Sequence, residues 1–433
     1  MKTITYEITN PLGMHARPAA FVAQACVALP SQITIKCGNK VANGDNVLQI
    51  LALDAQQGSV LEISAEGGDE DAALATIKDE LDHRLKRYEE VPVLKIAFFG
   101  AKDYDRIFFS ELASDVGEGA YNCDIKYFNA RLTPETAGLA KGFDAVCIFV
   151  NDECPRVAVE KLHECGVKLI LLRCAGFNNV DLQAAKECGI RVARVPAYSP
   201  YAVAEHAITL AMTCNRRMHK AVNKVKDNNF ALSGLLGVDL HNKVAGIMGT
   251  GKIGQCMANI CKGFGMTVLG WDAFPNQKLV ESGLLTYVDK DELLAKADLI
   301  SLHAPLIMGP NGTYHMIDAE AISKMKDTAI LINTARGGLI DTEALIEALK
   351  NGKFHAVGLD VYEGEDANVY TDHSDDFLVN DITARLTMFP NVVLTSHQAF
   401  FTREALQAIA AVTLENARNF NQGVDLGAAE CKA

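Results

Sequence analysis

The spacing of hydrophobic positions changes near residue 90. Before that point, short alternating segments are separated by helical repeats at close intervals. Strands that alternate with helices at such short range predict a small α+β sandwich. The predicted strands are Ile4–Thr9, Gln32–Cys37 and Val60–Glu66, and the predicted helices are Ala16–Val27, Asn46–Leu53 and Glu70–Leu85.

Two parallel sheets are predicted for the rest of the chain. Near-continuous apolar runs separated by helical segments are typical of parallel strands that helices cover on both faces. The first sheet comprises Lys95–Gly100, Asp124–Asn129, Ala145–Val150, Lys168–Cys174 and Ile190–Val195. The second comprises six strands at Lys243–Met248, Thr267–Asp272, Asp298–Leu302, Thr328–Thr334, Ala356–Val361 and Asn391–Ser396. The fold class is therefore α/β, with a small α+β sandwich followed by two doubly wound parallel-sheet domains.

Three domains are expected from the breaks in this pattern. The charged residues 86–90 and the proline of Val91-Pro92-Val93 end the first unit. Ser199, as N-cap, and Pro200, at the first helical position, begin a long helix between the two sheets. The last helix, Arg403–Phe420, has no strand of its own, and we place it against the first parallel sheet. The predicted domains are residues 1–88, residues 94–198 with 398–433, and residues 199–397.

Composition excludes several classes of protein. Acidic residues outnumber basic ones by 54 to 41, for a net charge of −13, which argues against nucleic-acid or anionic-membrane partners. No apolar run approaches the roughly 20 residues that span a bilayer, and Met1–Asn10 has the pattern of a strand, not of a secretion signal. The 12 cysteines form no C-x-x-C pair. We therefore expect free thiols in a reducing cytoplasm and no metal site.

A glycine-rich turn follows the first strand of the second parallel sheet. It comprises Gly249, Thr250, Gly251, Lys252, Ile253 and Gly254, and a helical pattern begins within it. Asp272 ends the next strand, close to the roughly 20-residue spacing expected for a ribose-binding acid. Glycines let the backbone approach a pyrophosphate at the helix N-terminus, and a carboxylate at Asp272 would repel a 2′-phosphate. A turn with a solvated aspartate is the alternative; the strand–turn–helix context favours an NAD site.

Three later strands of this sheet end in chemically capable residues: Arg336, Glu365 and His397. Ligands of open α/β sheets bind beyond the carboxyl ends of the strands. A guanidinium can bind a carboxylate in a bidentate fork, and an imidazole can donate a proton to a carbonyl oxygen as a hydride arrives. Glu365, if it pairs with His397, favours the imidazolium and orients it. A surface ion pair, a loop carboxylate and a structural histidine are the alternatives for these residues taken singly; together they indicate reduction of a 2-keto acid.

From Lys95 onward the chain resembles the D-isomer-specific 2-hydroxyacid dehydrogenases, most of all the fermentative D-lactate dehydrogenases. The matching stretches are residues 173–181, 195–200, 249–254, 333–337, 360–365 and 397–401. The resemblance implies a flavodoxin-like substrate domain and a Rossmann NAD domain. It makes Arg336 the ligand of the substrate carboxylate and makes Glu365 and His397 the acid/base pair. It also implies a dimer interface on the helix from Ser199, and hence a homodimer or a higher homo-oligomer.

The same resemblance assigns residues around the substrate and cofactor. Backbone N–H groups of Ala175 and Gly176 would bind the substrate carboxylate, and Tyr198, Phe149 and Phe400 would line the pocket. His303, Pro305, Thr334 and Asp360 would lie beside the cofactor. We expect an aromatic pocket with no second cation, which suits pyruvate. A bulkier 2-keto acid is the open alternative, because one methylene changes discrimination by only about 1–3 kcal/mol.

The stretch Gly13–Ala20 contains His15 and Arg17 at the start of a predicted helix. From spacing alone, a histidine that caps the helix is the favoured interpretation. However, residues 1 to about 85 resemble HPr, the histidine phosphocarrier of the sugar phosphotransferase system. That resemblance implies phosphorylation of His15 with Arg17 as its partner, an apolar docking patch at Val47 and Leu48, and phosphotransferase proteins as partners. Asn46 stands where many members have a regulatory serine. An NADH-sensing docking module without turnover is the alternative from another functional class.

Overall fold

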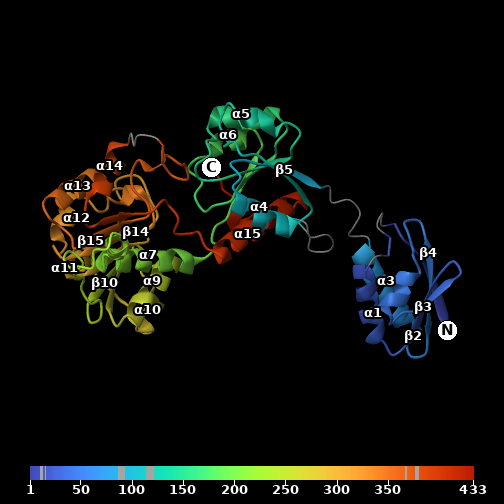
Figure 1. Ribbon diagram of the computed structural model, residues 1–433. Coiled ribbons are helices and arrows are strands. Elements are labelled where there is room, and N and C mark those ends of the chain that lie inside the picture. The colour runs from blue at the N-terminus through green and yellow to red at the C-terminus, as the bar shows by residue number, and fades with distance from the viewer. Residues whose placement is uncertain (10–12, 15, 86–92, 114–120, 366–367, 376–379) are drawn as a thin grey trace.

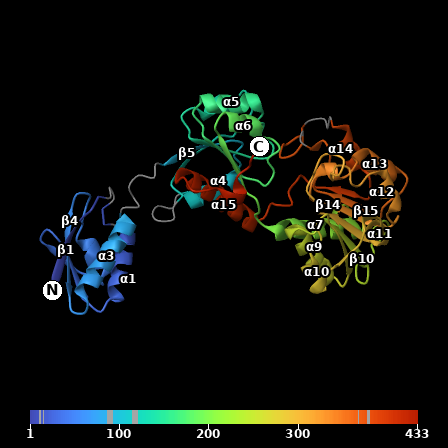
Figure 2. The same ribbon diagram turned by 180° about the vertical axis from the view of Figure 1, so that it is seen from behind.

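The computed structural model describes residues 1–9, 13–14, 16–85, 93–113, 121–365, 368–375 and 380–433, with the side chains of residues 16–17 and 83–85 left out of the description. Three sheets follow one another along the chain, and Figures 1 and 2 show each with its own helices. The predicted fold class, an α+β sandwich followed by two parallel α/β sheets, is confirmed.

The N-terminal unit is an antiparallel sheet covered on one face by helices (Figure 1). Its strand order is β1-β4-β2-β3, and Ile35, Ile63, Ile77 and Leu81 are fully buried between sheet and helices. The sequence pattern missed β3, because four residues with one buried side chain carry too little periodicity. The elements are β1 (Lys2–Glu7), α1 (Ala16–Val27), β2 (Gln32–Cys37), β3 (Lys40–Asn43), α2 (Val47–Ala52), β4 (Val60–Glu66) and α3 (Glu70–Leu85).

The second unit is built on a parallel sheet of order β6-β5-β7-β8-β9. Every residue of β7 and β8 is buried, which explains their uninterrupted apolar sequence. The elements are β5 (Leu94–Phe98), α4 (Asp103–Ala113), β6 (Cys123–Tyr127), β7 (Ala145–Ile148), α5 (Arg156–Glu164), β8 (Leu169–Leu172), α6 (Leu182–Glu187) and β9 (Arg191–Arg194), with a 3₁₀ turn at Ala137–Ala140.

The last long helix, α15 (Arg403–Asn421), returns to this second sheet. It packs beside α4 and against β8, and both ribbon views show it there. The Asn416 side chain donates a hydrogen bond to the Arg194 carbonyl at the end of β9, at 2.9 Å. Buried Leu406, Ile409 and Leu414 belong to the hydrophobic core of this sheet. The C-terminal segment, although distant in sequence, therefore completes the second unit.

The third unit is a parallel sheet of order β12-β11-β10-β13-β14-β15-β16. The prediction of six strands was wrong by one: β12 (Thr286–Tyr287) pairs with β11 at the edge and is too short to show any hydrophobic period. The other strands are β10 (Val244–Met248), β11 (Thr267–Trp271), β13 (Leu299–Leu302), β14 (Ile330–Asn333), β15 (Ala356–Leu359) and β16 (Val392–Leu394).

Eight α-helices of the described residues accompany the third sheet: α7 (Pro200–Asn215), α8 (Met218–Lys226), α9 (Lys252–Gly263), α10 (Gln277–Glu281), α11 (Lys290–Lys296), α12 (Ala319–Lys324), α13 (Thr342–Lys350) and α14 (Asp381–Met388). The predicted start of α7 is confirmed, since the Ser199 hydroxyl accepts a hydrogen bond from the Ala202 N–H and Pro200 is the first helical residue. This helix packs against β14 and β15 and against α9.

Candidate active site

A small pocket of about 40 Å³ lies where the loops that follow the strands of the second sheet meet the loops that follow the strands of the third sheet. Seven residues singled out from the sequence line it, and five further residues complete the wall. The predicted ones are Phe149, Ala175, Gly176, Tyr198, Arg336, His397 and Phe400; the others are Val150, Arg173, Cys174, Tyr370 and Ile409. These residues follow β7, β8, β9, β14, β15 and β16 or lie on α15. The two sheets thus present their carboxyl ends to one space, as expected for doubly wound folds.

The imidazole of His397 is paired with a carboxylate behind it. Its Nδ1 lies 3.0 Å from Oε1 of Glu365. Only 12% of the Glu365 side chain is exposed, whereas His397 reaches the pocket and is 24% exposed. Glu365 itself is absent from the pocket wall. The ring nitrogen that does not face Glu365, Nε2, is therefore the one available to a ligand.

The backbone of His397 adopts a left-handed conformation, with φ of +49°. Its N–H donates to the Asp360 carbonyl at 2.9 Å, and its carbonyl accepts from the Tyr370 hydroxyl at 2.8 Å. A non-glycine residue at positive φ costs of order 1–3 kcal/mol and persists where its surroundings determine it.

Arg336 is positioned by the end of β14. The Asn333 side chain accepts a hydrogen bond from the Ala335 N–H and donates one to the Arg336 carbonyl, at 3.0 and 2.9 Å. Across the pocket, a Cβ placed on Gly176 would lie 3.5 Å from the Arg336 Nη2. A carboxylate in this space could therefore accept hydrogen bonds from the guanidinium and from the backbone beside Gly176.

The expectation that the pocket has no second cation was wrong. Arg173 also lines the pocket, with its guanidinium 4.5 Å from the ring centre of Phe98 and 5.0 Å from that of Phe149. Its Nε lies 3.5 Å from Asp105 Oδ1, and Nη2 donates to the Gly100 carbonyl at 3.3 Å. Arg173 is only 4% exposed.

The charge of Arg173 is balanced by two buried carboxyl groups, Asp105 and Asp152. Burial raises the pKa of each carboxyl group, although Arg173 and backbone N–H groups act in the opposite direction. Asp152 accepts hydrogen bonds from the N–H groups of Leu132 and Phe149 at 2.7 and 2.6 Å. The second cation therefore belongs to a buried ionic cluster that supports the wall of the pocket at Phe149.

The glycine-rich turn has the steric character of a phosphate cradle. A Cβ on Gly249, whose φ is +93°, would lie 2.6 Å from the backbone of His303 and Ala304, and one on Gly254 would lie 2.0 Å from the Gly249 carbonyl oxygen. A Cβ on Gly251 would meet nothing within 4 Å. The turn is therefore tightly packed on one side and open at Gly251. The N–H groups of the first turn of α9, including those of Lys252 and Ile253, follow directly after this open position.

Asp272 lies directly after β11 and is tied to this turn. It accepts hydrogen bonds from the Thr250 N–H and hydroxyl at 2.6 and 3.0 Å and from the Phe274 N–H at 2.8 Å. A carboxylate has about four lone-pair sites. Asp272 is partly exposed and retains capacity for a ribose hydroxyl.

Two buried polar atoms after the neighbouring strands β13 and β14 have no partner among the described residues: Nδ1 of His303, after β13, and Oγ1 of Thr334, after β14. The other ring nitrogen of His303 lies 2.9 Å from the Ser301 hydroxyl. Burial lowers the pKa of His303 to about 4, so the ring is neutral near pH 7. Pro305 follows on the exposed part of the same loop. Unpartnered polar atoms and the open glycine turn fit a dinucleotide at this edge of the sheet.

Asp360 is more engaged than the sequence indicated. It is fully buried, and its carboxylate accepts hydrogen bonds from the Thr395 hydroxyl and from the N–H groups of Gln398 and Ala399, at 2.5, 2.9 and 2.9 Å. The His206 Nε2 on α7 lies 3.3 Å away. Burial opposes ionisation of Asp360, but these hydrogen bonds hold its pKa below the ordinary value. Asp360 thus shapes the loop that carries His397.

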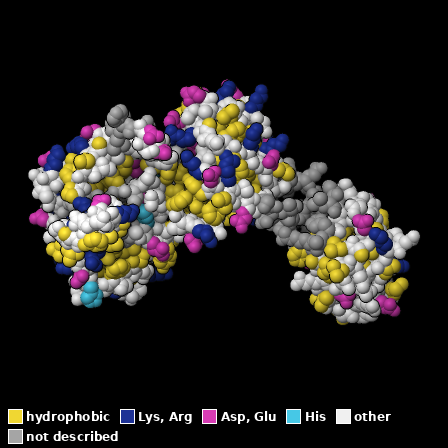
Figure 3. Space-filling model, viewed as in Figure 1, with side chains coloured by type: hydrophobic (Ala, Val, Ile, Leu, Met, Phe, Trp, Pro, Cys, Tyr) yellow, Lys and Arg dark blue, Asp and Glu magenta, His cyan; other side chains and the backbone are white. Residues whose placement is uncertain are grey.

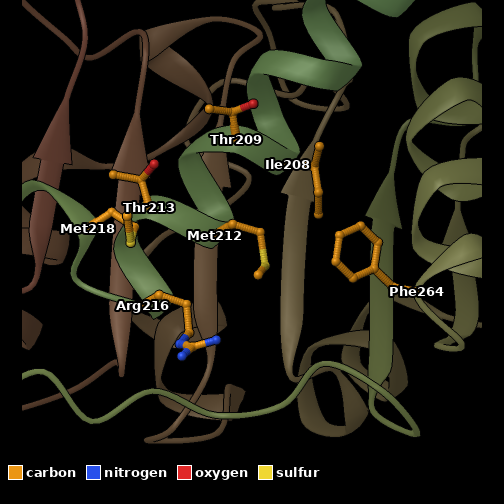
Figure 4. Close-up of a pocket in the computed structure, with 7 residues that line it drawn as sticks. All are labelled: Ile208, Thr209, Met212, Thr213, Arg216, Met218 and Phe264. Atoms are coloured by element: carbon orange, nitrogen blue, oxygen red, sulfur yellow. The ribbon is translucent and has the colours of Figure 1, made fainter.

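A larger hollow, of about 470 Å³, lies elsewhere, along α7 (Figure 4). Ile208, Met212 and Phe264 direct apolar side chains into it, and Figure 3 shows hydrophobic surface gathered over α7 and α9. It carries no paired acid and base and lies on the helix for which the resemblance implies a subunit interface.

The phosphocarrier prediction falls partly outside the described residues. His15 is not described, and neither is the Arg17 side chain. Nearby, Asn46 is the N-cap of α2, with its side-chain oxygen accepting from the Gln49 N–H at 3.1 Å. Leu48 is 77% exposed. An exposed leucine on a short helix is available for contact with a partner.

Within the described residues, no group of three His, Cys, Asp or Glu side chains is placed to hold a metal ion. None of the helices in the described part of the chain has the length and apolar character needed to cross a membrane. The 12 cysteines are all free thiols.

Comparison with known proteins supplies the family. Residues 208–399 match the family model for the NAD-binding domain of D-isomer-specific 2-hydroxyacid dehydrogenases, and residues 2–82 match the model for the HPr component of the phosphotransferase system with its phosphorylation site. The D-lactate dehydrogenase of Escherichia coli K12 is 47% identical over 330 residues, which cover 76% of this chain and 98% of that protein.

Solved structures agree with this assignment. The apo-structure of the E. coli D-lactate dehydrogenase aligns with a TM-score of 0.69 at 44% identity, covering 78% of this chain and 99% of the other. The pyruvate reductase of Chlamydomonas reinhardtii aligns with a TM-score of 0.73 at 40% identity, with the same coverage of 78% and 99%. The chain therefore belongs to the D-isomer-specific 2-hydroxyacid dehydrogenase family, as an NAD-dependent enzyme that carries an HPr domain at its N-terminal end.

Proposed function

We propose that the protein reduces pyruvate to D-lactate with NADH, and that Arg336, His397 and Glu365 carry the reaction. The observation that supports this most strongly is that Arg336 and His397 line one small pocket while Glu365 faces His397 from behind at 3.0 Å. The unpartnered atoms of His303 and Thr334 and the open turn at Gly251 support a nicotinamide cofactor beside that pocket.

The reaction needs one hydride and one proton. Bound NADH supplies the hydride that reaches C2 of the keto acid. Arg336 binds the carboxylate and, with the N–H groups of Ala175 and Gly176, orients the adjacent carbonyl. His397 donates the proton from Nε2 to the carbonyl oxygen, and the negative charge of Glu365 stabilises the imidazolium before transfer. Phe149, Tyr198 and Phe400 exclude water around the substrate methyl group. Asp272 binds the adenosine ribose, and Asp360, His303, Pro305 and Thr334 border the nicotinamide half.

A small substrate side chain is favoured by the pocket. The rings of Phe149, Tyr370 and Phe400 line it together, with ring centres 5.5 to 6.5 Å apart, and leave little room beside them. Asp105 and Asp152 offset the charge of Arg173, which lowers its attraction for a second acid group on the substrate. These features support pyruvate over a bulkier 2-keto acid.

The test is a panel of 2-keto acids of increasing size, assayed with NADH and NADPH and followed by chiral analysis of the product. The proposal predicts the highest kcat/KM for pyruvate with NADH and a D-lactate product. A higher kcat/KM for a branched 2-keto acid would contradict pyruvate as the substrate. No turnover with any member of the panel would favour the docking-module alternative.

We further propose that His15 in the HPr domain accepts a phosphoryl group from a phosphohistidine of the phosphotransferase system, with Arg17 as its partner. The match of residues 2–82 to the HPr family model supports this, and exposed Leu48 supports a docking patch with Val47. Incubation with the general phosphotransferase enzyme and phosphoenolpyruvate should label the wild-type chain but not His15→Ala. Labelling of both, or of neither, would contradict the proposal.

Assembly and location are also proposals. We propose a homodimer through α7, supported by the apolar hollow at Ile208, Met212 and Phe264, and a cytoplasmic location, supported by 12 free thiols. Light scattering of wild type and Met212→Glu tests the dimer, which the charged variant should dissociate.

We propose the domain limits 1–88, 94–198 with 398–433, and 199–397; the packing of α15 against β8 supports the divided second domain. The first limit lies within residues 86–92, outside the described residues.

A further inference from the structure

Tyr370 joins the substrate pocket to the backbone of the histidine that follows β16. It lies in the loop between β15 and α14 and lines the pocket together with Arg336 and His397. Its ring centre is 5.5 Å from that of Phe149, 6.5 Å from that of Phe400 and 6.3 Å from that of His397. The ring is therefore fixed by aromatic neighbours on more than one side.

The hydroxyl of Tyr370 has one specific partner. It donates a hydrogen bond to the His397 carbonyl oxygen at 2.8 Å. Burial raises the pKa of Tyr370, so the hydroxyl keeps its proton and remains a donor throughout the working range of pH. Both residues have positive φ, +62° for Tyr370 and +49° for His397. Two non-glycine residues in this costly region, joined to each other at the pocket, indicate a conformation that the hydrogen bond helps to determine.

The remaining bonds of the His397 backbone show what the Tyr370 hydroxyl adds. The His397 N–H is already bound to the Asp360 carbonyl, at 2.9 Å. Glu365 fixes the far side of the ring through Nδ1. The His397 carbonyl accepts its hydrogen bond from the Tyr370 hydroxyl. The peptide that follows His397 is thus held on both sides, because its N–H, that of Gln398, donates to the Asp360 carboxylate at 2.9 Å. Loss of the Tyr370 hydroxyl removes the restraint on the carbonyl side, which loosens ψ of His397 and with it the direction of Nε2.

We propose that Tyr370 is a positioning residue, whose hydroxyl holds His397 in its left-handed conformation and thereby aims Nε2 at the substrate carbonyl. This inference rests on the proposed role of His397 as proton donor. It gives Tyr370 no part in binding the substrate carboxylate or the cofactor. Its effect is therefore expected in the chemical step, where a small misplacement of a reacting group costs much of the rate.

The test is Tyr370→Phe, which removes the hydroxyl and keeps the ring, in the full-length protein. The matched control is Tyr127→Phe, which removes a hydroxyl bonded to Ser110, 3.1 Å away, on the second sheet and outside the pocket. A neutral hydrogen bond contributes about 1 kcal/mol, or roughly fivefold in rate. We expect kcat for pyruvate reduction to fall about 5- to 10-fold in Tyr370→Phe, with KM for pyruvate and Kd for NADH essentially unchanged. The isotope effect with C4-deuterated NADH should rise, because the chemical step becomes slower. Tyr127→Phe should match wild type in all of these quantities.

Three results would overturn the proposal. The first is a Tyr370→Phe variant with the kcat and isotope effect of wild type. The second is a variant whose affinity for pyruvate or NADH falls by as large a factor as its kcat. The third is a variant that does not fold, as judged by comparing its Tm with that of Tyr127→Phe. Failure of the proposed function is distinguishable from these results. In that case the wild-type protein would not reduce pyruvate, or the His397→Ala variant would reduce it at the wild-type rate.

Discussion

Oε1 of Glu365 lies 3.0 Å from Nδ1 of His397, although 32 residues separate them along the chain and each follows a different strand. The carboxylate is more buried than the ring it faces. This order, a buried carboxylate, then an imidazole, then the pocket, leaves one ring nitrogen for chemistry and fixes which nitrogen it is.

Replacing Glu365 with Gln should slow the reaction with little change in affinity. Glutamine keeps the size of the side chain but removes the charge that stabilises the imidazolium and weakens its orientation. We expect kcat to fall on the order of 10- to 100-fold, within the range that acid–base groups supply. The control is Glu363→Gln in the same loop, whose carboxylate faces His315 and which should retain most of its activity. Equal losses in the two variants, measured by steady-state kinetics, would show that Glu365 has no special role.

Replacing Arg336 with Lys should weaken substrate binding. Lysine keeps the charge but loses the planar fork that binds both carboxylate oxygens. Hydrogen bonds to charged groups contribute about 1.5–3 kcal/mol, so kcat/KM for pyruvate should fall roughly 10- to 100-fold. Affinity for NADH, measured by the fluorescence of Trp271 at the end of β11, should remain close to wild type. An unchanged kcat/KM would argue against Arg336 as the carboxylate ligand.

Two glycine substitutions in one turn should have different effects. A Cβ at Gly251 meets nothing within 4 Å of protein, whereas a Cβ at Gly254 lies 2.0 Å from the Gly249 carbonyl oxygen. We expect Gly251→Ala to keep the wild-type Tm but to bind NADH about 10-fold more weakly, because the methyl group occupies the space of the pyrophosphate. Gly254→Ala should lower Tm. If Gly251→Ala binds NADH normally, the pyrophosphate lies elsewhere.

The buried neutral ring of His303 should make the apo-protein less stable in mild acid. Its pKa is lowered to about 4 in the folded state, against about 6.5 in an unfolded chain. Between these values the unfolded state binds more protons, so the free energy of unfolding falls as pH falls from about 6.5 toward 4 and is unaffected by this group above that range. His303→Gln should reduce this loss of unfolding free energy at low pH, whereas His163→Gln, at an exposed position, should not. Urea unfolding followed by Trp271, the single tryptophan, measures it; identical slopes in wild type and His303→Gln would contradict the assignment.

The fold was predictable where burial imposes a pattern. Every residue of β7, β8, β13, β14 and β15 is buried, and each strand appears in the sequence as an apolar run, with Ser301 in β13 and Asn333 in β14 as buried polar exceptions. β12 was missed because two residues at a sheet edge have no period to detect. The local capping chemistry of Ser199 and Pro200 was sufficient to locate the start of α7.

The site was predictable where a loop after a parallel strand carries the residue. Arg336 and His397 could be identified because parallel strands bring their carboxyl ends to one edge. The presence of Arg173 as a second cation in the pocket wall was missed. Its charge is offset by Asp105 and Asp152, and the proximity of these carboxyl groups depends on tertiary packing. Tyr370 lies in a loop without hydrophobic periodicity, and its contact with the His397 carbonyl depends on positive φ at both residues, which no residue-type pattern indicates.

The most direct measurement of the central claim is the single-turnover rate of NADH oxidation by saturating pyruvate in His397→Ala. The account predicts a rate about 10²- to 10⁴-fold below wild type, with Kd for NADH unchanged and partial recovery of the rate when free imidazole is added. A variant that oxidises NADH at a rate near that of wild type would contradict the claim that His397 is the proton donor.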